Sequence, residues 1–234
     1  MISVCLATYN GGDMLKVQLE SIVDQLSDND EIVISEDGDL GKTRALVDEI
    51  PFHNIKVIEG ARAGNAIYNF EKSLHHSSGD IIFLADQDDK WLPGKVECMV
   101  KALQDADCVC SDCIVTDGGF NVISDSFYSV VGMKPGKYFN LLHRNCYLGC
   151  CMAFRRVVLK KALPFPKNLP MHDIWIGNVA AFFYRMKFIN EKLILFRRHG
   201  HNSSSTAGKS PYSLASKFGF RYQIIKDLML AMKR

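Results

Sequence analysis

The feature that most constrains the fold is a short apolar run, Ile81–Leu84, followed by the acidic stretch Asp86-Gln87-Asp88-Asp89. A run this short and apolar is typical of a strand buried on both faces of a sheet. Open α/β sheets bind ligands at the carboxyl ends of such strands, so we expect the carboxylates at a ligand site. Hard carboxylate oxygens suit Mg²⁺ or Mn²⁺, which readily hold phosphate oxygens. The alternative is a solvated turn before the next helix, because acids are favoured near helix N-termini.

Strand and helix patterns alternate through the first half of the chain, as in a parallel sheet flanked by helices. The spacing predicts strands at 2–8, 31–35, 55–58 and 81–84, and helices at about 15–26, 42–50, 66–76 and 93–104. In the less regular second half it predicts strands at 109–115, 147–154 and 192–196, a helix at 173–184 and a loop-rich flap at 117–145. We expect an α/β catalytic domain over residues 1–208 and an amphipathic helical tail over residues 209–234.

Composition is that of a globular protein, with 47% hydrophobic and 23% charged residues. No apolar run approaches the roughly 18 residues that span a bilayer, and the first residues lack the pattern of a signal peptide. We therefore expect a cytoplasmic protein whose eight cysteines are mostly reduced, buried thiols. Cys110 and Cys113 have a zinc-like spacing, but they lie in an expected strand without a matching second pair, which disfavours zinc.

Charge is distributed unevenly along the chain. Residues 209–234 contain six basic residues and one acid, a net charge of +5, which leaves −3 on the rest of a chain of net charge +2. This argues against general nucleic-acid binding and favours an anionic lipid surface for the tail. Apolar residues recur there at helical spacing, namely at Ala215, Phe218, Tyr222, Ile225, Met229 and Met232. The stripe fits an interfacial helix, or equally a helix that packs on the domain or on a second copy in a homodimer.

Five motifs, in a fixed order, carry a family resemblance. They are Ser3–Asn10, Glu36-Asp37-Gly38, Asp86–Trp91, His172-Asp173-Ile174-Trp175 and Arg197–Asn202. Together they resemble family 2 glycosyltransferases of the GT-A fold, similar to the bacterial rhamnosyltransferase-like enzymes that build O-antigen and capsule. The resemblance covers residues 1 to about 202. It implies a nucleotide-binding, mostly parallel sheet flanked by helices.

The resemblance implies a divalent cation, Mn²⁺ or Mg²⁺, held against the donor diphosphate. Asp88 and His199 match its ligands, and His201 is an alternative because it lies two residues away. Asp86 is expected near the ribose. Arg197 and Arg198 can offset diphosphate charge, since guanidinium groups suit phosphate oxygens.

The base-binding loop is expected at Thr8, Tyr9 and Asn10, with the Tyr9 ring available for stacking. Asp37 matches the acid that accepts the N3 proton of uracil or thymine. Where the family often reads Asp-Asp-Gly-Ser-Thr-Asp, this chain has Glu36-Asp37-Gly38-Asp39-Leu40-Gly41. Because this motif contacts the nucleotide in the family, the departure affects the contacts expected with the ribose and the choice between uracil and thymine.

Asp173 is the candidate general base, which removes the proton of the acceptor hydroxyl. The alternative is a helix N-cap, because an aspartate before an apolar helical run is a favoured cap. The side chains expected around the acceptor and the sugar are those of Asp89, Trp91, His172 and Trp175.

The resemblance predicts an inverting glycosyltransferase that moves a sugar from a UDP- or dTDP-sugar to a hydroxyl of a saccharide acceptor. We expect a polyprenyl-diphosphate-linked acceptor and a peripheral position at the inner face of the cytoplasmic membrane. One alternative is a catalytically silent sugar-nucleotide or polysaccharide-binding module. Another is a phosphoryl-transfer enzyme that uses the acidic cluster with two metals.

Overall fold

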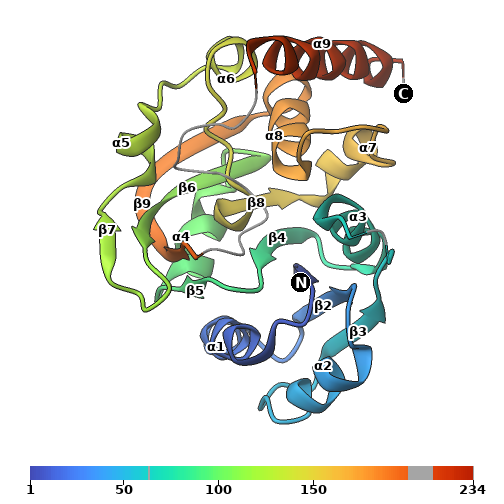
Figure 1. Ribbon diagram of the computed structural model, residues 1–234, viewed down its shortest axis with the longest axis vertical. Coiled ribbons are helices and arrows are strands. Elements are labelled where there is room, and N and C mark those ends of the chain that lie inside the picture. Colours follow the sequence, from blue (N-terminus) through green and yellow to red (C-terminus); the bar gives the residue numbers. More distant parts are fainter. Residues whose placement is uncertain (63, 200–212, 234) are drawn as a thin grey trace.

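The apolar strands form one sheet with helices on both faces (Figure 1). The computed structural model describes residues 1–62, 64–199 and 213–233. The first four strands lie in the order β3-β2-β1-β4, and every pair of neighbours is parallel. Their bounds are β1 Ile2–Thr8, β2 Glu31–Glu36, β3 Ile55–Glu59 and β4 Ile81–Asp86. Parallel pairing puts the carboxyl ends of β1, β2 and β4 at one edge of the sheet.

The second half of the sheet is mixed. From β4 it continues in the order β8-β6-β9-β5, with the short β7 paired to β6. β6 and β9 are parallel, whereas β8 is antiparallel to both β4 and β6. The bounds are β5 Lys90–Trp91, β6 Cys108–Thr116, β7 Val122–Ser124, β8 Met152–Arg155 and β9 Met186–Arg197.

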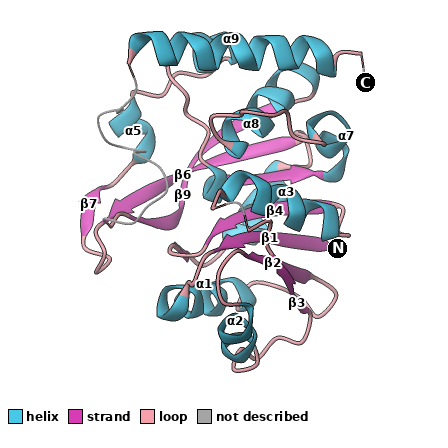
Figure 2. Ribbon diagram, turned by 45° about the vertical axis from the view of Figure 1, so that its right-hand side comes forward, coloured by secondary structure: helices cyan, strands magenta, loops and turns pink. Residues whose placement is uncertain are grey.

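Side-chain alternation divides the core between the two faces of the sheet. Val4 and Leu6 of β1 face one cluster, while Cys5 faces the other. The first cluster is covered by α1 Gly12–Val23, α2 Leu40–Val47, α4 Lys95–Ala102 and α5 Phe127–Val131. The second is covered by α3 Ala66–His76, α7 Leu159–Ala162, α8 His172–Phe183 and α9 Leu214–Ala231. Figure 2 shows α1 and α2 well separated from α8 and α9, with strands between them.

Two parts of the second half differ from expectation. The strand expected at 147–154 is reduced to β8, because a 3₁₀ turn occupies Gly149–Cys151. The expected flap at 117–145 contains β7, α5 and α6 (Lys137–Leu142), and it is anchored to the sheet. Tyr128 donates its hydroxyl to the Cys110 carbonyl at 2.7 Å, and the Asp112 carboxylate accepts the Tyr128 N–H at 3.0 Å.

The tail helix α9 has two apolar sides. Ile224, Leu228 and Ala231 are buried in the same cluster as α8. Most of the stripe predicted from the sequence points elsewhere, since Phe218 and Tyr222 are 69% and 71% exposed. The structure therefore shows a helix that packs on the domain and still presents an apolar side outward. In the described ranges, no helix is both long enough and apolar enough to cross a membrane.

Candidate active site

A cleft of about 290 Å³ opens at the carboxyl ends of β1, β2 and β4. Residues far apart in the sequence line it, and seven of the predicted site residues are among them. These seven are Thr8, Tyr9, Asp37, Asp86, Asp88, His172 and Asp173.

One end of the cleft is organised by Glu36, the last residue of β2, which is 1% exposed. Its carboxylate accepts the hydroxyl of Thr8 and the Thr43 hydroxyl at 2.6 Å. It also accepts the backbone N–H groups of Asn10 at 3.1 Å and Gly38 at 2.6 Å. One buried carboxylate thus holds together the two loops predicted to bind the nucleotide. The sequence motif contained Glu36, but we assigned it no role.

Neighbouring contacts fix the rest of this end. Asp37 accepts the backbone N–H of Arg62 and that of Gly64 at 2.9 Å, so it contacts the chain just before α3. The Gln87 side chain accepts the Tyr9 N–H at 2.8 Å, which ties the acidic loop to the β1–α1 loop. The Tyr9 side chain lies at the cleft and is 63% exposed. Its ring is therefore accessible to a flat partner.

The departure from the family motif at Asp39 has a local explanation. Asp39 is the N-cap of α2, where its side chain accepts the Lys42 N–H at 3.1 Å. This backbone hydrogen bond is the main reason why the pKa of Asp39 lies below its usual value. The predicted residue Asn10 lies beside Asp39 in a second hollow, and its side chain accepts the Asp39 N–H at 2.9 Å.

The acidic loop forms the floor between the two ends. Asp88 lines the cleft, and its Oδ2 lies 2.7 Å from Nε2 of His199, so these two residues from distant segments are in contact. Asp89 points inward and is fully buried, and it accepts the Arg197 N–H at 2.9 Å. Burial, together with the carboxylates of Asp88 and Asp173, raises the pKa of Asp86 to about 8. The crowding of carboxyl groups in this loop therefore disfavours the ionised form of Asp86.

The donor set fits a hard divalent cation. A carboxylate and an imidazole already in contact at an open cleft, beside a second carboxylate, match the ligands of Mn²⁺ or Mg²⁺. In the described part of the chain, another group of ligand atoms lies within 4.8 Å, formed by Asp86, Asp89 and Cys150. That group suits the cation less well, because Asp89 and Cys150 are fully buried and burial raises the pKa of the Cys150 thiol well above its usual value. Asp88 and His199 are therefore the better candidates.

The other end of the cleft is formed by α8 and the turn before β8. Asp173 accepts the N–H groups of Ile174 at 2.6 Å and Gly149 at 3.2 Å. The N-cap of α8 is Met171, so Asp173 lies in the first turn and is not the cap residue. Burial raises the pKa of Asp173 to about 6. A carboxylate with such a pKa is ionised at neutral pH and is still basic enough to take a proton.

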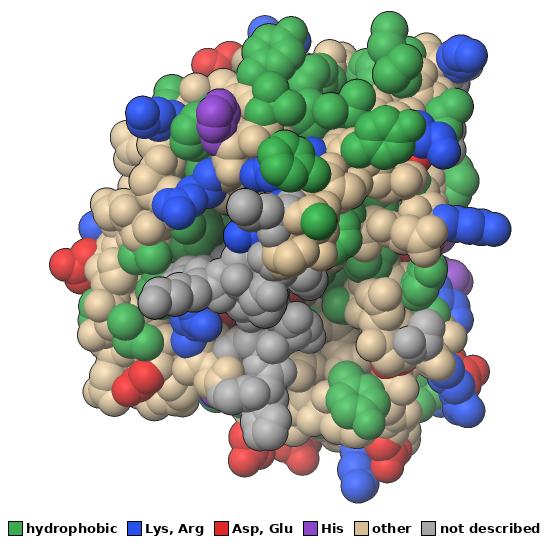
Figure 3. All heavy atoms as spheres, turned by 45° about the horizontal axis from the view of Figure 1, so that its top comes forward, with side chains coloured by type: hydrophobic (Ala, Val, Ile, Leu, Met, Phe, Trp, Pro, Cys, Tyr) green, Lys and Arg blue, Asp and Glu red, His purple; other side chains and the backbone are tan. Residues whose placement is uncertain are grey.

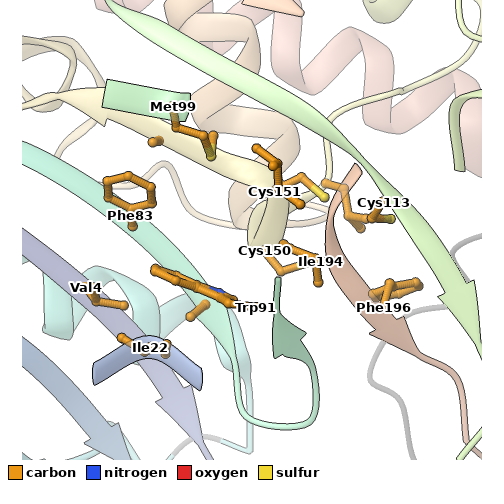
Figure 4. Close-up of a cluster of buried hydrophobic side chains, with 14 of the residues drawn as sticks. Val4, Ile22, Phe83, Trp91, Met99, Cys113, Cys150, Cys151, Ile194 and Phe196 are labelled. Carbon is orange, nitrogen blue, oxygen red and sulfur yellow. The ribbon is translucent and has the colours of Figure 1, made fainter. Parts of the chain in front are cut away.

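The structure corrects two sequence predictions. Trp91 and Trp175, which we expected near the sugar, are 1% and 0% exposed. Trp91 packs on Phe83, with ring centroids 5.5 Å apart, among Val4 and Ile22 (Figure 4). The Trp175 indole donates to the Ala162 carbonyl at 2.8 Å. Neither ring presents a face to a ligand, because both serve the core.

Four predicted residues lie beside the cleft, outside its described lining, namely His199, Arg197, Arg198 and Asp89. The Arg197 guanidinium lies 3.8 Å from the centroid of the Phe120 ring, and its backbone supports Asp89. Arg198 donates its backbone N–H to Thr116 at 2.8 Å. Asp89 is fully buried, so the prediction that it contacts the sugar or the acceptor is wrong. His201, the alternative metal ligand, lies outside the described residues.

Several residues that line the cleft were not predicted from the sequence. They are Asn65, Ala66, Asn69, Phe70, Gln87, Leu148, Gly149, Met171 and Phe196. Pocket walls of this kind are set by tertiary packing. Of these, only Gln87 lies inside a quoted motif, and its position between two acids was the available clue.

Comparison with known proteins agrees with this geometry. The family model "Glycosyl transferase family 2" matches residues 3–163. An uncharacterised glycosyltransferase of a Nostoc species is 26% identical over 98% of this chain and 76% of its own. The Escherichia coli protein WfgD, named as a UDP-Glc:alpha-D-GlcNAc-diphosphoundecaprenol beta-1,3-glucosyltransferase, is 26% identical over 73% of this chain and 64% of its own. The Shigella flexneri dTDP-rhamnosyl transferase RfbG is 24% identical over 84% of this chain and 72% of its own.

Solved structures show the same fold. Staphylococcus aureus TarS residues 1–349, in complex with UDP-GlcNAc, superposes with a TM-score of 0.69 at 16% identity, over 97% of this chain and 66% of that one. The mannosyltransferase PcManGT of Pyrobaculum calidifontis, in complex with GDP-Man and Mn²⁺, gives a TM-score of 0.61 at 16% identity, over 88% and 58%. The curled, mostly parallel sheet is thus the GT-A fold predicted from the sequence. With more than half of its length matched by the family model, the chain belongs to glycosyl transferase family 2.

Proposed function

We propose that the chain is an inverting, metal-dependent glycosyltransferase that moves a sugar from a UDP- or dTDP-sugar to a hydroxyl of a saccharide acceptor. One observation carries the proposal. Asp37, Asp88 and Asp173, contributed by three separate segments, line a single cleft at the carboxyl ends of parallel strands. A nucleotide-sugar transferase needs hydrogen-bond acceptors for the nucleobase and a group that offsets the negative charge of the diphosphate. It also needs a general base that removes the proton of the incoming hydroxyl.

The nucleotide lies across Thr8–Asn10 and Asp37 in this proposal. The exposed Tyr9 ring stacks on the base. The Asp37 oxygens accept two backbone N–H groups, and each oxygen has a second lone pair. Asp37 therefore keeps the capacity to accept the N3 proton of uracil or thymine. Asp86 lies at the end of β4, where it contacts the ribose.

Asp88 and His199 would hold Mn²⁺ or Mg²⁺, which offsets negative charge on the departing diphosphate when bound. The other groups prepare the transfer. Asp173 accepts the proton of the acceptor hydroxyl while its carboxylate stays oriented by the Gly149 and Ile174 N–H groups. Attack on the anomeric carbon from the side opposite the diphosphate needs this one base and inverts the configuration.

Isothermal titration calorimetry with UDP, dTDP and GDP, each with Mn²⁺ or with EDTA, tests the donor assignment. We expect UDP or dTDP to bind in a metal-dependent manner and GDP to bind more weakly. A transfer assay with UDP-glucose, UDP-N-acetylglucosamine and dTDP-rhamnose then tests the reaction. Metal-dependent binding without any transfer would favour the silent binding module. Cleavage of the diphosphate to a nucleoside monophosphate and a sugar 1-phosphate would favour phosphoryl transfer.

A lipid-linked saccharide is the acceptor we propose, since the printed name of WfgD gives a diphosphoundecaprenol-linked acceptor for that relative. In the same proposal residues 1–208 catalyse the reaction, and the tail, residues 209–234, meets the inner face of the cytoplasmic membrane. The outward side of α9 supports this role. Besides Phe218 and Tyr222 it carries Met229, 62% exposed, and Lys226 and Lys233 are also exposed. Figure 3 shows hydrophobic side chains with Lys and Arg among them along this edge of the molecule.

An anionic bilayer would match both the exposed apolar residues and the lysines on the outward side of α9. Basic residues near an anionic surface contribute about 1 kcal/mol each, and salt weakens the effect. We expect the triple variant Phe218→Ser, Tyr222→Ser, Met229→Ser to lose co-sedimentation with anionic vesicles at low salt. The matched control, Val122→Ser with Ile123→Ser, changes similarly exposed apolar residues on β7 and should bind as the unmodified chain does. Equal binding of all three proteins, or self-association that only the triple variant loses, would contradict the membrane assignment.

A further inference from the structure

Lys95, the first residue of α4, is a lysine without access to solvent. Its side chain is 0% exposed, as is that of Met99 one turn further along the helix, so both lie on the face that packs against the sheet. Lysines are almost never fully buried unless the ammonium group has a partner. Burial accordingly lowers the pKa of Lys95 from its usual value. The proposed transfer assigns no role to this group, so its position needs an explanation.

The Lys95 ammonium group contacts the turn before β8. Its Nζ donates to the Cys150 carbonyl at 2.9 Å and lies 4.8 Å from the centroid of the Trp91 ring. Trp91 and Cys150 belong to the buried cluster in Figure 4. The lysine thus connects α4 to the 3₁₀ turn Gly149–Cys151 inside the core.

The same turn supports the candidate base. The backbone N–H of Gly149 donates to the Asp173 carboxylate at 3.2 Å. The turn also packs tightly against α8, since a Cβ atom at position 149 would lie 2.8 Å from Nε2 of His172 and 3.5 Å from Cβ of Asp173. Gly149 and Cys150 are consecutive in the chain. A shift of the Cys150 carbonyl would therefore move the Gly149 N–H relative to the carboxylate.

We propose that Lys95 is a positioning residue of the transfer, which holds the Cys150 carbonyl and thereby keeps the Gly149 N–H directed at Asp173. The inference rests on the proposed function, in which Asp173 is the general base. Lys95 is buried and is not among the residues that line the cleft, so it acts through the turn and not on a ligand. The Gly149 N–H both orients the carboxylate and favours its ionised form.

A double-mutant cycle with Lys95→Met and Asp173→Asn tests this coupling. Methionine keeps an unbranched side chain of similar length and removes the donor. We expect Lys95→Met to lower kcat roughly tenfold, which corresponds to one hydrogen bond at the base. In the Asp173→Asn background it should lower kcat no further. The KM for the nucleotide sugar and the calorimetric affinity for UDP or dTDP should not change.

The pH profile gives a second readout. Burial raises the pKa of Asp173 to about 6, while the N–H groups of Ile174 and Gly149 act in the opposite direction. Loss of the Gly149 contact should raise this pKa further and move the acid limb of kcat/KM upward by as much as about one pH unit. The other titratable groups that face Asp173 are unchanged in Lys95→Met, namely Asp86, His172 and Cys151. An acid limb at the same pH in a less active Lys95→Met variant would overturn the proposal.

Lys101→Met is the matched control, because Lys101 is exposed on the same helix. It should leave kcat, KM and the pH profile unchanged. If Lys95→Met fails to fold, Lys95→Gln, whose donor is one bond closer to the backbone, enters the same cycle with the same expected outcome. Effects on kcat that multiply in the double variant would show that Lys95 acts independently of Asp173, and would overturn the inference alone. Near-normal turnover of Asp173→Asn would instead refute the proposed base, and the inference with it.

Discussion

The two ends of the cleft satisfy their buried polar groups in opposite ways. At the nucleotide end, Glu36 receives four hydrogen bonds from the protein itself. At the acceptor end, His172 has no partner in the described residues, and burial raises the pKa of Asp173 to about 6. The carboxylate of Glu36 is thus paired within the protein, whereas the second end combines two unpaired ring nitrogens with a carboxylate that accepts two N–H groups. Under the proposed function, the first end would contribute to nucleotide affinity and the second to turnover.

Asp88 lies between the two ends, and its loss should have the largest effect. Asp88→Ala removes the carboxylate that contacts His199, so we expect activity to fall by at least about 10³-fold and metal-dependent nucleotide binding to disappear. Calorimetry with Mn²⁺ and a transfer assay measure both. Asp13→Ala removes an exposed acid on α1 and should leave both unchanged. Undiminished nucleotide affinity in Asp88→Ala would place the cation elsewhere, for example at the buried group around Cys150.

Asp173→Asn tests the acceptor end directly. Turnover should fall about 10²- to 10⁴-fold, because an amide cannot take the proton, while nucleotide affinity stays the same. Stability at pH 7.5 should change little, because the variant loses one of the two N–H hydrogen bonds to Asp173 but also loses a buried ionised carboxylate that its raised pKa shows to be disfavoured. Steady-state kinetics and thermal unfolding measure the two effects. A variant with near-normal turnover would return Asp173 to a structural role in the first turn of α8.

The pH dependence should follow the same carboxylate. Because the pKa of Asp173 is raised to about 6, the base is ionised above that pH and protonated below it. We expect kcat/KM at saturating metal to fall about tenfold for each pH unit below 6. Of the titratable groups facing Asp173, burial raises the pKa of Asp86 to about 8 and lowers that of His172 to about 3. A profile that is flat between about pH 5 and 7 would argue against Asp173 as the base.

The smallest effect on turnover is expected at the nucleotide end. Glu36→Gln replaces a buried acceptor of four hydrogen bonds by an amide that can accept at only one atom. We expect a loss of roughly 2–3 kcal/mol in the free energy of unfolding and a severalfold weaker nucleotide affinity, with kcat nearly unchanged. Chemical denaturation and calorimetry measure these values. If the Glu36→Gln variant were as stable as the unmodified chain but inactive, the proposal that this end contributes to stability and nucleotide affinity, and not to turnover, would be wrong.

Much of the first half could be read from the sequence, because local patterns dominate there. Short apolar runs separated by helical periods gave the four parallel strands within about two residues. In the second half, α5 and α6 are five and six residues long, too short for helical periodicity to be recognised. The residues before β8 form a 3₁₀ turn instead of a strand, since Gly149 and Cys150 turn the chain under the cleft.

Within the site, the motifs identified residues but not always their orientation. Asp88 and His199 were predicted as partners across 111 positions, and they are in contact. Trp175 is two residues from Asp173 in one helix, and residues at that spacing do not share a face. The helical period could therefore have excluded it. The role of Glu36 depends on four donors, from β1, α2 and two loops, and no local pattern shows such a convergence.

The acidic loop is anchored to the sheet at both of its ends. Asp86 ends β4 in the interior of the sheet, and Lys90 begins β5, which pairs with β9 at the far edge. The loop is therefore short and is held at both ends by strands that are paired in the sheet. It cannot swing outward to separate its carboxyl groups unless strand pairing breaks, so burial and the neighbouring carboxylates raise the pKa values of Asp86 and Asp89 instead. Binding of a divalent cation to the loop should therefore release protons, and the released protons can be measured by calorimetry in buffers of different ionisation enthalpy.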